Sequence, residues 1–155
     1  GDVTSLQWKH INFEDSKLSK VIRKTGNLHS FRLVQPALDV LKKYKNENST
    51  DESFVFSLVK NEQKFLKNEY YAISEIQRIS QNINYEFKDL SQKLELNSKL
   101  TFHMSRHTFA TNALNNGMRI EHVSKVMDHS SIRVTEIYAK VINTELDASM
   151  DKFVY

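Results

Sequence analysis

The sequence predicts a mainly α-helical domain with a small antiparallel β-sheet, an α+β fold. Over most of the chain, apolar residues repeat every three or four positions, the spacing of one helix face. Two short β-compatible runs near the N-terminus are separated by a glycine turn. The chain has three glycines and one proline among 155 residues, so few positions would interrupt a helix. This length suits one domain with its own core.

The N-terminal third predicts a hairpin followed by a helix. The β-compatible runs are residues 18–24 and 28–34, and the segment 25–27 between them, Thr-Gly-Asn, has turn composition. Pro36 then suits a first helical position, and apolar residues follow it at helical spacing. We expect this helix to end in the polar stretch 46–52.

The remainder predicts further helices. Tyr70 to Leu94 has helical periodicity, with a break near Asn82 as an alternative. Thr101 can cap a helix from about Phe102 to Asn116, and Gly117 can close it in the left-handed conformation.

Three shorter segments complete the chain. A helix is expected over 120–127, and Ser130 or Ser131 can cap another that carries Tyr138. Residues 139–155 have apolar side chains at helical spacing and could form a terminal helix docked on its own domain.

The composition excludes several kinds of site. Without cysteine the chain has no disulfide framework, no thiolate metal site and no cysteine nucleophile. No run of some twenty apolar residues and no signal segment is present, so neither a membrane span nor secretion is indicated. We therefore expect a soluble cytoplasmic protein.

Charge is unevenly distributed along the chain. Residues 1–45 hold nine basic and four acidic residues, whereas residues 46–98 hold six and nine. The basic N-terminal third could follow a phosphate backbone, although on charge alone an ordinary solvated surface explains it equally well.

The densest polar cluster lies in residues 101–111. His103 and Arg106 stand three positions apart at the start of the expected helix, so they share one face. An imidazole and a guanidinium can together bind a phosphate, and the helix N-terminus adds partial positive charge. Further along, His129 precedes Tyr138 by nine residues with a helix start between them, which can place an imidazole and a phenol on opposite sides of one phosphate.

Together these motifs resemble the catalytic domains of tyrosine recombinases, the integrase family. That family carries a His-x-x-Arg box, then a Gly-His-Ser/Thr segment, then a tyrosine nine residues after that histidine. The matching residues here are His103 and Arg106, then His129, then Tyr138. Three linked motifs in order are more specific than any one of them. One departure is Asp128, which stands where glycine is usual.

The resemblance extends toward the N-terminus. Residues 2–11 are similar to the segment just after the family's first catalytic arginine, and residues 23–26 to its strand-borne lysine and turn. Lys24 is then the lysine, with Lys20 and Arg23 as alternatives after a small register shift. The first arginine would fall just before residue 1. The resemblance thus implies a catalytic domain over 1–155, truncated before that arginine and the family's N-terminal DNA-binding domains, and strongly impaired in cleavage by itself.

By resemblance, each residue has a role in site-specific DNA recombination. Tyr138 attacks a phosphodiester to form a 3′-phosphotyrosyl link, which requires loss of a proton that phenols ordinarily hold to about pH 10. His103 is the candidate general acid or base, and Lys24 protonates the departing 5′-oxygen. Arg106 and His129 bind the non-bridging oxygens. Protein cations serve in place of a metal, so neither a metal nor another cofactor is expected.

The family also implies partners. They are double-stranded DNA, further copies of the chain in a tetramer during synapsis, and accessory DNA-bending proteins. The terminal segment 139–155 would then dock on a neighbouring protomer as an alternative to its own domain. The expected setting is the bacterial nucleoid, and the expected process is integration or excision of a mobile element.

Other interpretations stay open. Tyr138 could be a core residue with a satisfied hydroxyl. His107 lies four residues from His103, but no third metal ligand is evident, which favours a core or hydrogen-bonding role. The chain could be a catalytically silent DNA-binding or assembly module, while the lack of clustered carboxylates disfavours a metal-dependent nuclease.

Overall fold

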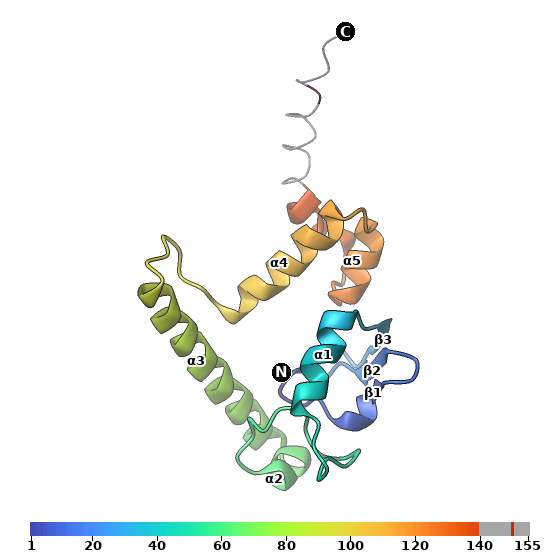
Figure 1. Cartoon of the computed structure of the whole chain (residues 1–155), viewed down its shortest axis with the longest axis vertical. Coiled ribbons are helices and arrows are strands. Elements are labelled where there is room, and N and C mark those ends of the chain that lie inside the picture. Colours follow the sequence, from blue (N-terminus) through green and yellow to red (C-terminus); the bar gives the residue numbers. More distant parts are fainter. Residues whose placement is uncertain (140–149, 151–155) are drawn as a thin grey trace. The chain divides into compact units, whose positions relative to one another are not determined.

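The chain divides into two compact units, Gly1–Asn82 and Ile83–Tyr155. The computed structural model describes residues 1–139 and Met150 (Figure 1). The boundary between the units lies inside the longest helix, α3 (Glu69–Lys93). Each unit has its own cluster of buried apolar side chains.

The first unit contains a three-stranded antiparallel sheet in the order β1-β2-β3. The strands are β1 (Ile11–Asn12), β2 (Lys17–Val21) and β3 (Leu28–Arg32). The hairpin of β2 and β3 confirms the one predicted from sequence, but its first strand ends at Val21 and not at residue 24, because the Ile22 N–H and carbonyl already bond within the turn. Gly26 in this turn has a φ of 72°, in the left-handed region that favours glycine. β1 was not predicted, because two residues are too short to show alternation.

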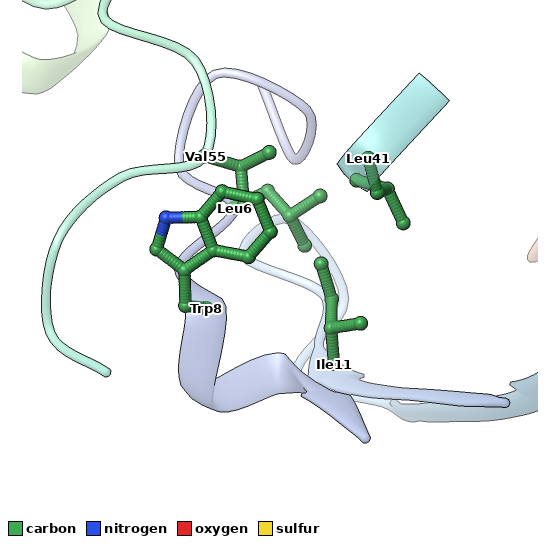
Figure 2. Close-up of a cluster of buried hydrophobic side chains, with 5 residues drawn as sticks. All are labelled: Leu6, Trp8, Ile11, Leu41 and Val55. Atoms are coloured by element: carbon green, nitrogen blue, oxygen red, sulfur yellow. The ribbon is translucent and has the colours of Figure 1, made fainter. Parts of the chain in front are cut away.

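A 3₁₀ turn, η1 (Trp8–His10), and helix α1 (Gln35–Tyr44) pack with the sheet around one apolar core. α1 has a proline in its first turn, as the sequence predicted. Figure 2 shows the buried side chains of this core, which are Leu6, Trp8, Ile11, Leu41 and Val55. Burial of each such side chain contributes roughly 1.5–3 kcal/mol relative to exposure, so this cluster holds α1 against η1 and β1.

Two helices follow α1 along the chain. α2 (Glu62–Lys67) begins at Asn61, whose side chain accepts a hydrogen bond from the Lys64 N–H. This short helix was not predicted. α3 continues without interruption through Asn82, so the alternative of a break there is wrong.

The described part of the second unit contains the end of α3, then α4 (Phe102–Asn115), α5 (Ile120–Val126) and a 3₁₀ turn, η2 (Ile132–Val134). Residues 136–139, which follow η2, are helical. Figure 1 shows α4 and α5 as a helical hairpin, in agreement with the helices predicted for this part.

The ends of these helices depend on single residues. Thr101 does not cap α4 with its side chain; the Asn84 side chain accepts the Phe102 N–H instead, at 2.9 Å. Gly117 closes α4 with a φ of 82°, as predicted. Ser131 caps η2 by accepting the Arg133 N–H.

The terminal helix expected over 139–155 lies outside the described residues apart from its first position and Met150. Among the helices that are described, none has the length and apolar character needed to cross a membrane.

A buried carboxylate joins α3 to the segment before α2. Glu75 accepts two hydrogen bonds from the Arg78 guanidinium, both at 2.9 Å, and one from the Lys60 N–H. Arg78 also donates to the Leu58 carbonyl. The hydrogen bonds from Arg78, more than any other cause, lower the pKa of Glu75 to about 2.

We expect Glu75→Gln to reduce the stability of the protein in a pH-dependent manner. The folded-state pKa of Glu75 is below the ordinary value of 4.5, so the carboxylate contributes fully above that pH and loses its contribution as pH falls toward 2. Urea unfolding at several pH values should therefore show a difference between the two proteins that is largest near neutrality and shrinks below pH 4.5. A difference independent of pH would contradict this account. Asp89→Asn, which breaks the exposed pair with Lys93, is the matched control and should change little.

Candidate active site

Four of the five residues selected from the sequence lie in the second unit. His103 and Arg106 lie in the first two turns of α4. His129 lies in the loop between α5 and η2, and Tyr138 lies in the helical turn that follows η2. The site is thus built from one helix and one segment that immediately follows the helical hairpin.

The guanidinium of Arg106 connects these two parts. It is half-buried and donates a hydrogen bond to the main-chain carbonyl of Met127, two residues before His129. A guanidinium has five N–H donors in a fixed plane, so one bond to the protein orients the group and leaves donors for an anion. The charge of Arg106 also influences the pKa of His129, because the two groups are close.

The ring of His129 is held by a buried hydroxyl. Its Nδ1 lies 2.8 Å from Oγ1 of Thr135, a residue with 0% of its surface exposed. When the hydroxyl donates to Nδ1, the neutral imidazole carries its proton on Nε2 and can donate there to a phosphate oxygen. Thr135 is therefore a positioning residue that the sequence did not reveal, since a threonine three residues before Tyr138 has no distinctive signal.

Burial and charge together favour the neutral form of His129. Its pKa is lowered first by burial and then by the positive charge of Arg106, while the carboxylate of Asp128 acts in the opposite direction. A neutral imidazole remains a hydrogen-bond donor, so this shift preserves the interaction expected with a phosphate.

Asp128 has a φ of 50°, in the left-handed region where glycine is the least strained residue. Here the His129 N–H bonds to the carbonyl of Ser124, at the end of α5. The family's preference for glycine at this position has a steric reason, and aspartate is among the residues that tolerate this conformation.

Tyr138 belongs to the core of the second unit. The residue is 7% exposed and packs with Ala110, Val123 and Met127. Its hydroxyl lies 2.7 Å from Nδ1 of His107, whose side chain is exposed. The hydrogen-bonding role that the sequence favoured for His107 is confirmed.

His103 contacts His107 on the exposed face of α4. The rings of His103 and His107 pack edge to face, with centroids 4.7 Å apart. Within the described residues the Tyr138 hydroxyl makes its hydrogen bond with His107 and not with His103. The spacing of four residues places both histidine rings on one helix face, but it does not indicate which of them meets Tyr138.

Lys24 lies in the first unit, in the turn after β2, with an exposed side chain. Of the two alternatives, Lys20 is buried, donates to the Ser5 carbonyl and has a pKa lowered mainly by burial. The Arg23 guanidinium lies over the Phe65 ring, 5.5 Å from its centroid. Both are held by partners in their own unit, which favours Lys24, but its place beside Tyr138 remains a prediction.

Among the described residues, no third metal-ligating side chain joins the pair of His103 and His107. In residues 1–139 and at Met150, no three side chains of histidine, cysteine, aspartate or glutamate gather in a way that could hold a metal ion.

We expect Arg106→Gln to raise the pKa of His129 toward 6.5, because one of the two causes that lower it is removed. Burial should still keep the value below that of a solvated imidazole. Titration of the histidine ring resonances by NMR measures the change, and Arg119→Gln, which alters an exposed arginine beside Glu121, is the control. An unchanged His129 titration in Arg106→Gln would contradict the proximity of the two groups.

Comparison with known proteins agrees with these motifs. The family model described as the phage integrase family matches residues 1–145. The chain is 26% identical over 153 residues to the tyrosine recombinase XerA of Pyrococcus furiosus, which covers 97% of the chain and 48% of the relative. It is 29% identical over 153 residues to the tyrosine recombinase XerC of Pediococcus pentosaceus, covering 98% of the chain and 48% of that protein. The chain thus spans about half the length of these curated relatives.

Solved structures agree on the fold. The crystal structure of XerA recombinase matches with a TM-score of 0.66 at 19% identity, over 100% of this chain and 53% of that one. The Tn1549 transposon integrase, solved in complex with a circular intermediate DNA, matches with a TM-score of 0.55 at 19% identity, over 94% of this chain and 53% of that one. The mainly α architecture with a small sheet is therefore that of a tyrosine recombinase catalytic domain. Since the family model extends from Gly1 past Tyr138, this chain belongs to the phage integrase family, the tyrosine recombinases.

Proposed function

We propose that this chain is the catalytic part of a site-specific recombinase that cuts and rejoins DNA through a 3′-phosphotyrosyl intermediate. The observation that carries the proposal is the gathering of a phenol, imidazoles and a guanidinium in the second unit. The Tyr138 hydroxyl is bonded to an imidazole, Arg106 is oriented by the Met127 carbonyl, and His129 is oriented by Thr135. These groups can supply a nucleophile and preorganised hydrogen-bond donors for a phosphodiester.

In the proposed cleavage step, Oη of Tyr138 bonds to phosphorus while the bond to the 5′-oxygen breaks. The phosphotyrosyl bond conserves the energy of the phosphodiester, so rejoining needs no ATP. Attack of the freed 5′-hydroxyl of a partner strand on the same phosphorus would then complete the exchange.

Arg106 and His129 would stabilise the charge on the non-bridging oxygens in the transition state. Arg106 has a fixed plane of donors, and the shifted pKa of His129 keeps it neutral and able to donate. Preorganised donors of this kind contribute about a hundredfold or more each to the rate. The first arginine of the family would add a second guanidinium, and we propose that it precedes Gly1 in the protein.

The substrate would be the DNA of a mobile element that integrates and excises. The Tn1549 transposon integrase, which has a similar fold, was solved in complex with a circular intermediate DNA, and this supports the assignment. On DNA we propose a tetramer of recombinase subunits and accessory DNA-bending proteins. The basic residues of the first 45 positions would follow the phosphate backbone, so binding should weaken with salt.

One observation favours the alternative of a catalytically silent DNA-binding module. Tyr138 is only 7% exposed, and its ring contributes to the core of the second unit. A nucleophile needs to present its oxygen to DNA, whereas a core tyrosine does not. Formation of a covalent adduct separates the two functions.

We expect the protein to form a covalent adduct with DNA that Tyr138→Phe abolishes. The protein is expressed from its full reading frame, and its duplex site is first selected from a random library by binding. A nick next to the cleaved bond lets the 5′-hydroxyl fragment diffuse away, so the adduct accumulates and survives denaturing electrophoresis. Phenylalanine keeps the packed ring and removes only the hydroxyl, so the variant should fold and bind DNA.

Tyr71→Phe, a change on α3, is the matched control and should leave the adduct unchanged. DNA binding without any adduct would favour the silent module. Loss of activity on adding a chelator would instead indicate a metal-dependent nuclease.

We expect Lys24→Ala to slow cleavage about a hundredfold or more, because it removes the proposed acid for the 5′-oxygen. A substrate with sulfur in place of that 5′-oxygen should largely restore the rate, since a thiolate leaves without being protonated. Lys17→Ala changes another exposed lysine of the hairpin and should show no such selectivity for sulfur. Equal slowing of Lys24→Ala on both substrates would exclude Lys24 as the acid.

A further inference from the structure

We propose that His107 is the proton acceptor for Tyr138, and so a catalytic residue outside the His-x-x-Arg box. This inference rests on the proposed function, because it assigns the base for the same cleavage step. From sequence, His103 was the candidate for that proton.

The first argument is geometric. The Tyr138 hydroxyl lies 2.7 Å from Nδ1 of His107, within the 2.6–3.2 Å reach expected of a nucleophile and its general base. The two rings are tilted by 50° with centroids 5.4 Å apart, so the contact joins the polar atoms and is not a stacked pair. When the phenol donates its single hydrogen to Nδ1, lone pairs on the oxygen remain for attack on phosphorus.

The second argument concerns what holds His107 in place. Within the described residues its ring contacts two titratable side chains, His103 one turn earlier on α4 and Tyr138. The edge-to-face contact with His103 restrains the His107 ring, which supplies the third, orienting group of a nucleophile–base–orienter arrangement. His103 then acts as a positioning residue for the base.

The third argument is exposure. Tyr138 is buried, whereas the side chain of His107 is exposed. A proton that moves from the phenol to His107 therefore reaches a group that water can solvate, and the resulting imidazolium is not trapped in an apolar core.

The proton balance closes without another reactant. During cleavage the Tyr138 proton moves to Nδ1 of His107 as the oxygen–phosphorus bond forms, and the departing 5′-oxygen takes a proton from the acid, proposed to be Lys24. During rejoining the 5′-hydroxyl returns its proton to the lysine, and the His107 imidazolium protonates the released tyrosine oxygen. Both groups end as they began.

The test uses His107→Asn and His107→Ala in the same nicked-duplex assay. The side-chain oxygen of asparagine lies close to the position of Nδ1, so it can accept the hydrogen bond but cannot take the proton near neutral pH. We expect both variants to form the adduct about a hundredfold or more slowly at neutral pH while binding DNA normally. In the asparagine variant the rate should keep rising by about tenfold per pH unit into the alkaline range, because the base then comes from solution. In the unaltered protein the rate of adduct formation should instead reach a plateau, because the imidazole itself supplies the base.

His122→Asn, which removes an exposed histidine from α5, is the matched control and should behave as the unaltered protein. His103→Asn should lower the rate but keep the pH profile of the unaltered protein. Thermal unfolding checks each fold, and His107→Gln replaces any variant that fails to fold.

The assay distinguishes a failure of this inference from a failure of the proposed recombinase function. A normal rate and pH profile in His107→Asn, whatever the effect of alanine, would overturn proton acceptance by His107 and leave the recombinase function intact. Failure of the unaltered protein to form an adduct on DNA that it binds would refute the recombinase function and this inference with it.

Discussion

The hydrogen bond from Arg106 to the Met127 carbonyl is the interaction that joins the two parts of the candidate active site. It fixes α4 against the segment that carries His129, Thr135 and Tyr138. Burial is the main cause that lowers the pKa of His129, and the charge of the same guanidinium lowers it further, so Arg106 both orients the site and affects its charge state. A residue with this dual role cannot be replaced by lysine without loss, because an ammonium has neither the plane nor the spread of donors.

Tyr138 has a structural and a proposed chemical role. Its ring packs with Val123 and Met127, while its hydroxyl leaves the core through the bond to His107. The structural interpretation of this tyrosine and the catalytic one are thus compatible, because they concern different ends of one side chain. Packing fixes the ring, and in the proposed mechanism the imidazole accepts the hydroxyl proton.

Much of the fold could be predicted from periodicity and turn chemistry. The hairpin around Gly26, the helix beginning near Pro36 and the closure of α4 at Gly117 each depend on a local signal that sequence retains. The cap of α4 could not be predicted, because Asn84 is 18 residues away and acts through tertiary contact. β1 and α2 are too short to show a period.

The candidate site, too, could be predicted only in part from the sequence. Motif spacing selected His103, Arg106, His129 and Tyr138, and the structure places all four in one unit. The partners that orient them were not visible in sequence, because the bond between Tyr138 and His107 spans 31 positions and the Thr135 hydroxyl has no motif. Sequence identifies residue types that suit a reaction, whereas hydrogen-bond pairing requires coordinates.

The left-handed backbone at Asp128 has an electrostatic consequence as well as a steric one. A glycine at this position would adopt the same backbone conformation without adding a charge. Asp128 adds a carboxylate next to the His129 imidazole, whose pKa the Arg106 guanidinium also affects. Arg106 and Asp128 therefore act in opposite directions on the charge state of His129. If the proposed DNA substrate binds here, the carboxylate would cancel part of its attraction to this site without having to touch the DNA.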